Sequence, residues 1–111
     1  MLNYKIYQIK NVADTDYAFR GYDPKKFNFA DDECMYEGEH IDHPIDYETG
    51  EQRTATDILE ELFVQFNVSR PHDFKGHSMS MSDVVELEKD GRRLFFYCDT
   101  FGFKLLDFEP I

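Results

Sequence analysis

The sequence predicts an α+β fold, in which a small antiparallel sheet with a C-terminal β-hairpin carries one main amphipathic helix on a face. Apolar residues recur at helical spacing in one segment, and two β-like segments flank the dipeptide Asp90-Gly91. With 111 residues, of which 41% are hydrophobic, the chain can build one modest core. We therefore expect a single α+β domain over residues 1–111, with an acidic surface segment at residues 31–61.

The helix is expected from about Thr56 to Phe66. Thr54 or Thr56 can cap it, because a hydroxyl oxygen accepts a hydrogen bond from a free N–H in the first turn. The apolar residues share one face of a helix at this spacing, which predicts that they pack on the sheet. They are Ile58, Leu59, Leu62, Phe63 and Phe66.

The hairpin is expected to join Val84–Lys89 to Arg92–Cys98 through the two-residue turn Asp90-Gly91, a strong hairpin signal. This turn pairs Lys89 with Arg92, and alternation then assigns the two faces. The predicted core face carries Val85, Leu87, Leu94, Phe96 and Cys98. The other face carries Val84, Glu86, Glu88, Arg93, Phe95 and Tyr97.

Further strands are expected at Tyr4–Ile9, around Met35–Glu37 and at Leu105–Phe108. Between the first two of these, Asp14–Phe29 is interpreted as short helical turns or loop whose aromatic side chains face the core. His40–Thr54 contains Pro and Gly and few apolar residues, which is typical of a long surface loop, and such loops are often functional.

The acidity is concentrated in one segment. Between Asp31 and Glu61 there are twelve acidic residues and one basic residue, Arg53, so this segment has a net charge of −11, equal to that of the whole protein. Such asymmetry indicates an acidic face. The alternative interpretation is a solvated surface that keeps the protein soluble.

Motifs for catalysis or cofactor binding are not evident. The sequence lacks a phosphate-binding loop, a nucleophile elbow and a paired-cysteine zinc site. His40 and His43, with Asp42 and Asp46, have metal-ligating side chains in a segment without a rigid element to fix them. His77, Ser78 and Asp83 contain the groups of a triad, but no pattern places a base against a nucleophile. We expect no catalytic residue, metal or cofactor.

The chain is expected to lie in the cytoplasm of a bacterial host cell. It has no apolar stretch near the roughly 20 residues that span a bilayer, and its first residues do not form a signal peptide. Cys34 and Cys98 are expected to be free, mostly buried thiols.

Two long motifs resemble the YodL-like domain family. They are RPHDFKGHSMSMSDVVEL, residues 70–87, and FYCDTFGF, residues 96–103. IYQIK near the start, MYEGE and the QFN that ends the helix are similar as well. The resemblance implies a setting in mobile genetic elements of Firmicutes, often near antirestriction genes, but no enzymatic activity. The acidic stretch from Glu39 to Thr54 is longer than the link that the family has there.

From these observations we expect a counter-defence inhibitor, an anti-CRISPR or antirestriction protein, that mimics DNA. Its partner would be a basic nucleic-acid-binding protein, such as an RNA-guided CRISPR nuclease, and it would bind neither nucleic acid nor a membrane. The candidate partner-binding residues are Asp31, Asp32, Glu33, Glu37, Glu39, Asp42, Asp46, Glu48 and Glu51.

Two alternatives remain. One is a non-catalytic protein–protein interaction module that binds a host protein through an aromatic surface, with Phe95 and Tyr97 as anchors. The other is a small hydrolase that uses His77. Salt dependence separates the first two hypotheses, because binding by carboxylates weakens with salt more than aromatic docking does.

Overall fold

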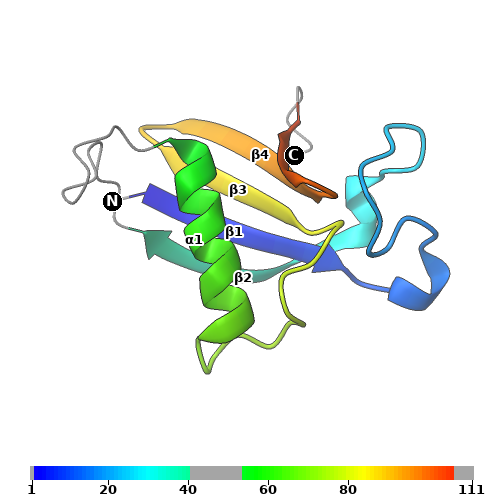
Figure 1. Ribbon diagram of the computed structural model, residues 1–111, viewed down its shortest axis with the longest axis horizontal. Helices are drawn as coiled ribbons and strands as arrows, with labels where there is room; N and C mark the ends of the chain where they lie inside the picture. The colour runs from blue at the N-terminus through cyan, green and yellow to red at the C-terminus, as the bar shows by residue number, and fades with distance from the viewer. Residues whose placement is uncertain (1, 41–53, 107–111) are drawn as a thin grey trace.

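A computed structural model describes residues 2–40 and 54–106 (Figure 1). Its strands form one antiparallel sheet in the order β2-β1-β3-β4-β5, with helix α1 across one face. This confirms the predicted α+β class. The elements are β1 (Leu2–Ile9), η1 (Val12–Asp14), η2 (Phe29–Asp31), β2 (Asp32–His40), α1 (Ala55–Val68), β3 (Val84–Lys89), β4 (Arg92–Asp99) and β5 (Gly102–Leu105).

Helix α1 begins where the sequence predicts. Thr54 accepts a hydrogen bond from the backbone N–H of Asp57, and the Asp57 carboxylate accepts one from the backbone N–H of Thr54. This reciprocal capping box provides acceptors for two backbone N–H groups that have no acceptor within the helix. Four of the five predicted apolar residues are buried, whereas Phe63 remains 37% exposed.

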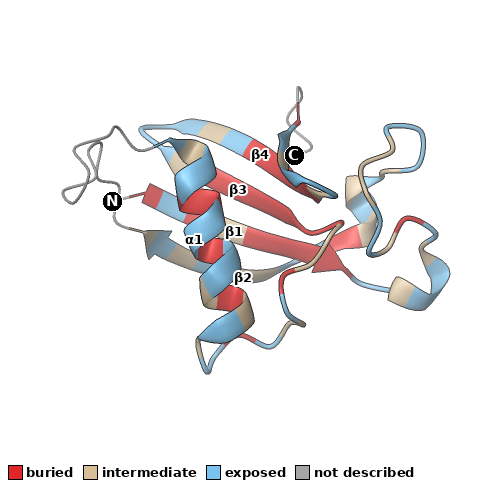
Figure 2. Ribbon diagram, viewed as in Figure 1, coloured by how far each residue is buried: buried red, intermediate tan, exposed pale blue. Residues whose placement is uncertain are grey.

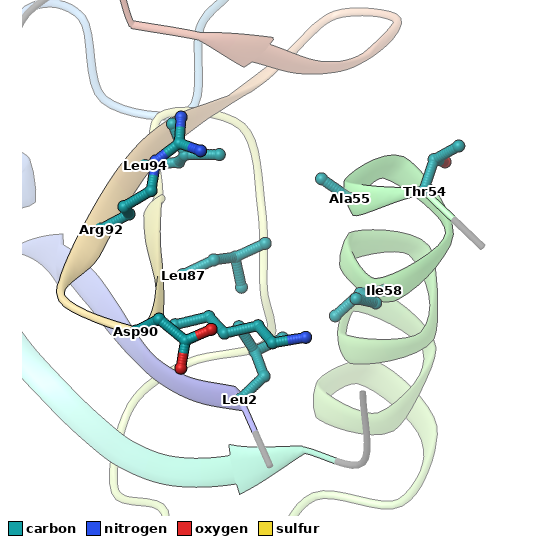
Figure 3. A pocket seen from close by; sticks show the side chains of 9 residues that line it. Leu2, Thr54, Ala55, Ile58, Leu87, Asp90, Arg92 and Leu94 are labelled. Atoms are coloured by element: carbon teal, nitrogen blue, oxygen red, sulfur yellow. The ribbon is translucent and has the colours of Figure 1, made fainter. Parts of the chain in front are cut away.

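The hairpin forms with the predicted register. Lys89 pairs with Arg92 and Val85 with Phe96, and the turn residues Asp90 and Gly91 both have positive φ, 53° and 79°. Such a turn has the twist that two adjacent strands require. One expected core residue, Leu94, is instead 40% exposed, because it lines an open pocket between the hairpin and the first turns of α1 (Figure 3).

Both faces of the sheet are partly buried, so the structure has two cores (Figure 2). Helix α1 covers the first. Segment 17–31, which we call the aromatic cap, covers part of the opposite face. The helix-side core comprises Leu2, Tyr4, Ile6, Ile58, Leu59, Leu62, Phe66, Phe74, Met79, Val85, Leu87 and Phe96. The cap-side core comprises Tyr7, Val84, Phe95, Tyr97 and Leu106, with Tyr22, Phe27 and Phe29 packed against it.

The cap-side core covers Phe95 and Tyr97, the anchors of the alternative aromatic-surface hypothesis. They are 1% and 0% exposed, because the rings of the aromatic cap lie against them. Phe27 meets the Tyr97 ring edge-on with centroids 5.4 Å apart, and the Tyr97 hydroxyl donates to the Arg20 carbonyl at 3.0 Å. These two residues stabilise the fold and are not available as anchors in this structure.

The second and fifth strands differ in length or place from the prediction. β2 is longer than the expected strand at Met35–Glu37. It pairs with β1 through backbone hydrogen bonds, which form whether the side chains are polar or apolar. β5 begins at Gly102, three residues before the predicted Leu105, and the end of the predicted strand lies outside the described residues. The predicted first strand is confirmed and extends back to Leu2.

Candidate functional site

The predicted acidic residues fall into two groups. Asp42, Asp46, Glu48 and Glu51 lie outside the described residues. The other five, Asp31, Asp32, Glu33, Glu37 and Glu39, lie on η2 and the edge strand β2. The structure therefore shows where these five point.

Glu37 and Glu39 project from the sheet face opposite the helix. They pair with Lys5 and Asn3 of β1, whereas the intervening Gly38 pairs with Tyr4, a residue of the helix-side core. Because side chains alternate along a strand, the two glutamates share the open part of the cap-side face. Both are exposed.

Glu33 is separated from them by a β-bulge. The pairing between β1 and β2 shifts between Ile6 and Tyr7, so that Met35 is the extra residue in β2. The bulge reverses which side chains of β2 point to each face of the sheet. Glu33 pairs with Gln8, which lies on the helix side, so Glu33 also lies on the helix side. The acidic residues of β2 therefore do not form one continuous surface.

Two rows of polar residues cross the open face. In the first row Lys5 lies between Glu37 and Glu86, and in the second Asn3 lies between Glu39 and Glu88. These six residues, with Tyr4 and Gly38, line a shallow hollow of about 370 Å³. Glu86 and Glu88 were absent from the predicted binding residues, although their alternation in β3 placed them on this face.

Two described positive charges at this hollow, Lys5 and Arg93, lie near carboxylates. Lys5 Nζ lies 3.7 Å from Glu37 Oε1, and Arg93 lies 3.6 Å from the buried carboxylate of Glu86. The Tyr7 hydroxyl also donates to Glu86 at 3.4 Å. Glu86 is thus held inside the sheet surface, while Glu37, Glu39 and the half-buried Glu88 surround the hollow with carboxylates.

Asp32 corrects the expectation of a surface charge, because it is buried at the start of β2. Burial, the nearby Asp83 and the adjacent Asp31 raise the pKa of its carboxyl to about 7. It therefore binds a proton far more readily than an exposed aspartate. Asp31 is half-buried and accepts a hydrogen bond from the Tyr17 hydroxyl at 3.0 Å, which anchors the aromatic cap.

A buried polar cluster is formed by the motif of residues 70–87 and β1. Gln8 donates from Nε2 to Asp83 at 3.0 Å and to the His77 carbonyl at 3.0 Å. Asp83 also accepts the backbone N–H of Ser80. Burial raises the pKa of the Asp83 carboxyl to about 7, and these donated hydrogen bonds limit the rise. Gln8 was not predicted, since an isolated Gln in a strand carries no motif.

His77 and Asp83 of the hypothetical triad lie near each other, and both also bond to neighbouring groups. His77 Nδ1 lies 2.7 Å from the Ser78 carbonyl, and its Nε2 is 3.9 Å from Asp83. The Ser80 hydroxyl donates to the Ser78 carbonyl at 2.9 Å. Gly76 does not have positive φ; a Cβ there would collide with Gln8 Oε1 and the Phe74 ring. Close approach of this segment to β1 therefore requires glycine.

The structure also shows the surroundings of His40, one of the candidate metal ligands, and of the two cysteines. His40 Nε2 lies 3.0 Å from Glu61 Oε2 on α1, while His43 lies outside the described residues. Within residues 2–40 and 54–106, no three His, Cys, Asp or Glu side chains form a group that could hold a metal. Cys98 is buried as expected, but Cys34 is exposed, because it lies on the edge strand β2.

Comparison with known proteins identifies one family. The model of the YodL-like domain matches residues 3–108, nearly the whole chain. No curated protein and no solved structure matches the chain. None of the helices in the described part of the chain has the length and apolar character needed to cross a membrane.

Proposed function

This chain is a member of the YodL-like domain family, and we propose that it is a counter-defence inhibitor of a mobile genetic element. It binds the nucleic-acid groove of a host nuclease, either a restriction enzyme or an RNA-guided CRISPR nuclease. The binding surface is acidic and takes the place of DNA. The interaction occurs in the cytoplasm of the bacterial host.

The observation that carries this proposal is the placement of Glu37 and Glu39. They project two residues apart from the open face of an edge strand, beside Glu88. Alternate side chains of a strand are about 6.8 Å apart, a separation comparable to that of neighbouring phosphates. A nuclease displays lysine and arginine to neutralise such phosphates. The hollow between these carboxylates has room for one such basic side chain.

The acidic segment carries further charge that follows β2 in the sequence. Residues 41–53 follow β2 directly and carry four of the predicted binding residues, Asp42, Asp46, Glu48 and Glu51. Binding by this surface would be driven by many exposed charges rather than by one site. It should therefore be strongly sensitive to salt.

Lys5 gives the proposal a test in the opposite direction. It lies 3.7 Å from Glu37 in the middle of the carboxylates, where it competes with any basic side chain of a partner. Lys5→Gln removes this competitor and makes the face more acidic. If the face is the binding surface, this substitution should strengthen inhibition.

The experiment is a DNA-competition assay with purified restriction and RNA-guided nucleases at two salt concentrations. Glu37→Gln/Glu39→Gln should weaken binding about two- to thirtyfold, since each exposed ion pair contributes about 0.2–1 kcal/mol. Lys5→Gln should strengthen it. Neutralising Asp42, Asp46, Glu48 and Glu51 as well should weaken it further. Glu33→Gln, the same change on the other face, is the matched control.

The proposal is overturned if none of the nucleases is inhibited by the wild type. It is also overturned if Glu37→Gln/Glu39→Gln inhibits as strongly as the wild type at both salts. Equal losses for Glu33→Gln and for Glu37→Gln, which each remove one charge, would show that net charge alone acts, without the open face of β2.

A further inference from the structure

A second surface lies on the helix side of the molecule. A groove of about 510 Å³ runs between α1 and the turn that joins β4 to β5. Phe63 and Val64 line it from the helix, Phe103 from β5, and Met81 from the segment before β3. The Phe63 and Phe103 rings meet edge-on with centroids 6.3 Å apart, so they form a continuous aromatic wall.

Several large apolar side chains at this groove are exposed to solvent. Val64 is 58% exposed and Phe63 37%, although they lie on a helix whose other apolar face is fully buried. Phe101 is 95% exposed and lies between Thr100 and Gly102, which both line the groove. A cluster of exposed large apolar side chains is typical of a protein-binding surface, and phenylalanines are frequent anchors there.

The charges of the groove indicate what kind of partner it fits. Among the described residues that line it, the charged ones are both acidic, Glu60 and Asp99. Glu60 is exposed, whereas Asp99 Oδ1 accepts the backbone N–H groups of Tyr22 and Thr100. A second copy of this chain would place the same carboxylates against one another, in a protein whose net charge is already −11. A protein segment with apolar side chains next to lysine or arginine would bury its apolar side chains in the groove. Its lysine or arginine would then form ion pairs with the carboxylates.

We propose that this groove binds a protein segment in which large apolar side chains adjoin lysine or arginine. Val64 and Phe63 contact the apolar side chains within the groove, and Phe101 extends this contact beside it. The exposed Glu60 pairs with the basic side chains. The groove is on the helix side, whereas Glu37 and Glu39 project from the opposite face of the sheet. The two surfaces can therefore bind independently, and this proposal does not require the nuclease to be the partner.

The experiment selects phage-displayed 12-residue peptides against the wild type, with counter-selection against Val64→Ser/Phe101→Ser. We expect enriched peptides that combine at least two large apolar residues with Lys or Arg. In binding assays with the synthesised peptides, Val64→Ser and Phe101→Ser should each weaken affinity about tenfold or more. Val68→Ser is the matched control, because Val68 is 78% exposed on the same helix but does not line the groove.

Two measurements separate this inference from its alternatives. Glu37→Gln/Glu39→Gln should bind the peptides as the wild type does; a loss would mean that basic peptides bind the acidic face by charge, which overturns the inference. Sedimentation of the wild type should give a monomer, and a dimer that Phe101→Ser abolishes would assign the groove to a second copy. Failure to enrich peptides, or enrichment of peptides without a basic residue, also overturns it. Unchanged melting temperatures show that the variants fold.

Discussion

Gln8 donates its side-chain N–H to Asp83 Oδ2 at 3.0 Å, across 75 positions of sequence. Asp83 directly precedes β3, and its carbonyl accepts the backbone N–H of Cys98 at 2.8 Å. Gln8 also donates to the His77 carbonyl, so one side chain of β1 holds the family motif against the sheet. The hydrogen bonds of Gln8 thus join the motif of residues 70–87 to the first strand of the sheet.

Asp32→Asn is expected to change how stability depends on pH. The folded-state pKa of Asp32 is about 7 and its ordinary value 3.8, so between these values the folded protein keeps a proton that the unfolded chain has lost. Stability should therefore fall as pH rises from about 4 through 7. Asp83 contributes in the same sense. Asp32→Asn should reduce this slope, as measured by urea unfolding at pH 4.5, 6 and 7.5.

The exposed neighbour Glu33 provides the control for Asp32, because Glu33→Gln removes a carboxylate without removing a buried one. Its unfolding curves should shift with pH as the wild type's do. An Asp32→Asn slope identical to that of the wild type would show that Asp32 is ionised in the folded state at neutral pH.

Gly76→Ala is expected to destabilise the fold by about 1–3 kcal/mol, because the new methyl group meets Gln8 Oε1 and the Phe74 ring. Gln8→Ser makes room for it, so the double variant should lose less stability than the sum of the two single losses. Denaturant unfolding of the four proteins gives this coupling. Lys75→Ala, at the exposed adjacent position, is the control; strict additivity would refute the contact.

Leu62→Ala is expected to lower the free energy of unfolding by about 2–5 kcal/mol, since Leu62 is fully buried between α1 and the sheet. Such a loss is a large part of the stability of a small domain. Chemical denaturation followed by circular dichroism measures it. Val64→Ala, on the exposed side of the same helix, should cost much less, and similar losses for both would contradict the assigned helix face.

Tyr97→Phe is expected to cost about 0.5–1.5 kcal/mol, because it removes the hydrogen bond to the Arg20 carbonyl but keeps the ring packing. Amide hydrogen exchange should increase within the aromatic cap, residues 17–31, and less in α1. Affinity for a nuclease partner should not change. Lost affinity with normal exchange in the cap would instead support Tyr97 as a binding anchor.

The sequence by itself determined the elements whose signals are local. Asp90-Gly91 specified the hairpin register, because only a tight turn with positive φ joins strands at that spacing. The period of the apolar residues specified the helix, and the sequence offered Thr54 or Thr56 as its cap, of which the structure uses Thr54. The acidic bias of residues 31–61 is likewise a property of the sequence alone.

Tertiary structure decided which side chains are accessible, since burial depends on what packs above a residue. Sequence alternation could not show that the aromatic cap covers Phe95 and Tyr97, or that Asp32 is buried near Asp83. Nor could it locate the bulge at Met35, which results from pairing between β1 and β2 and separates Glu33 from Glu37. The surface that the carboxylates form is therefore set by pairing and packing over long sequence distances, which a local pattern does not encode.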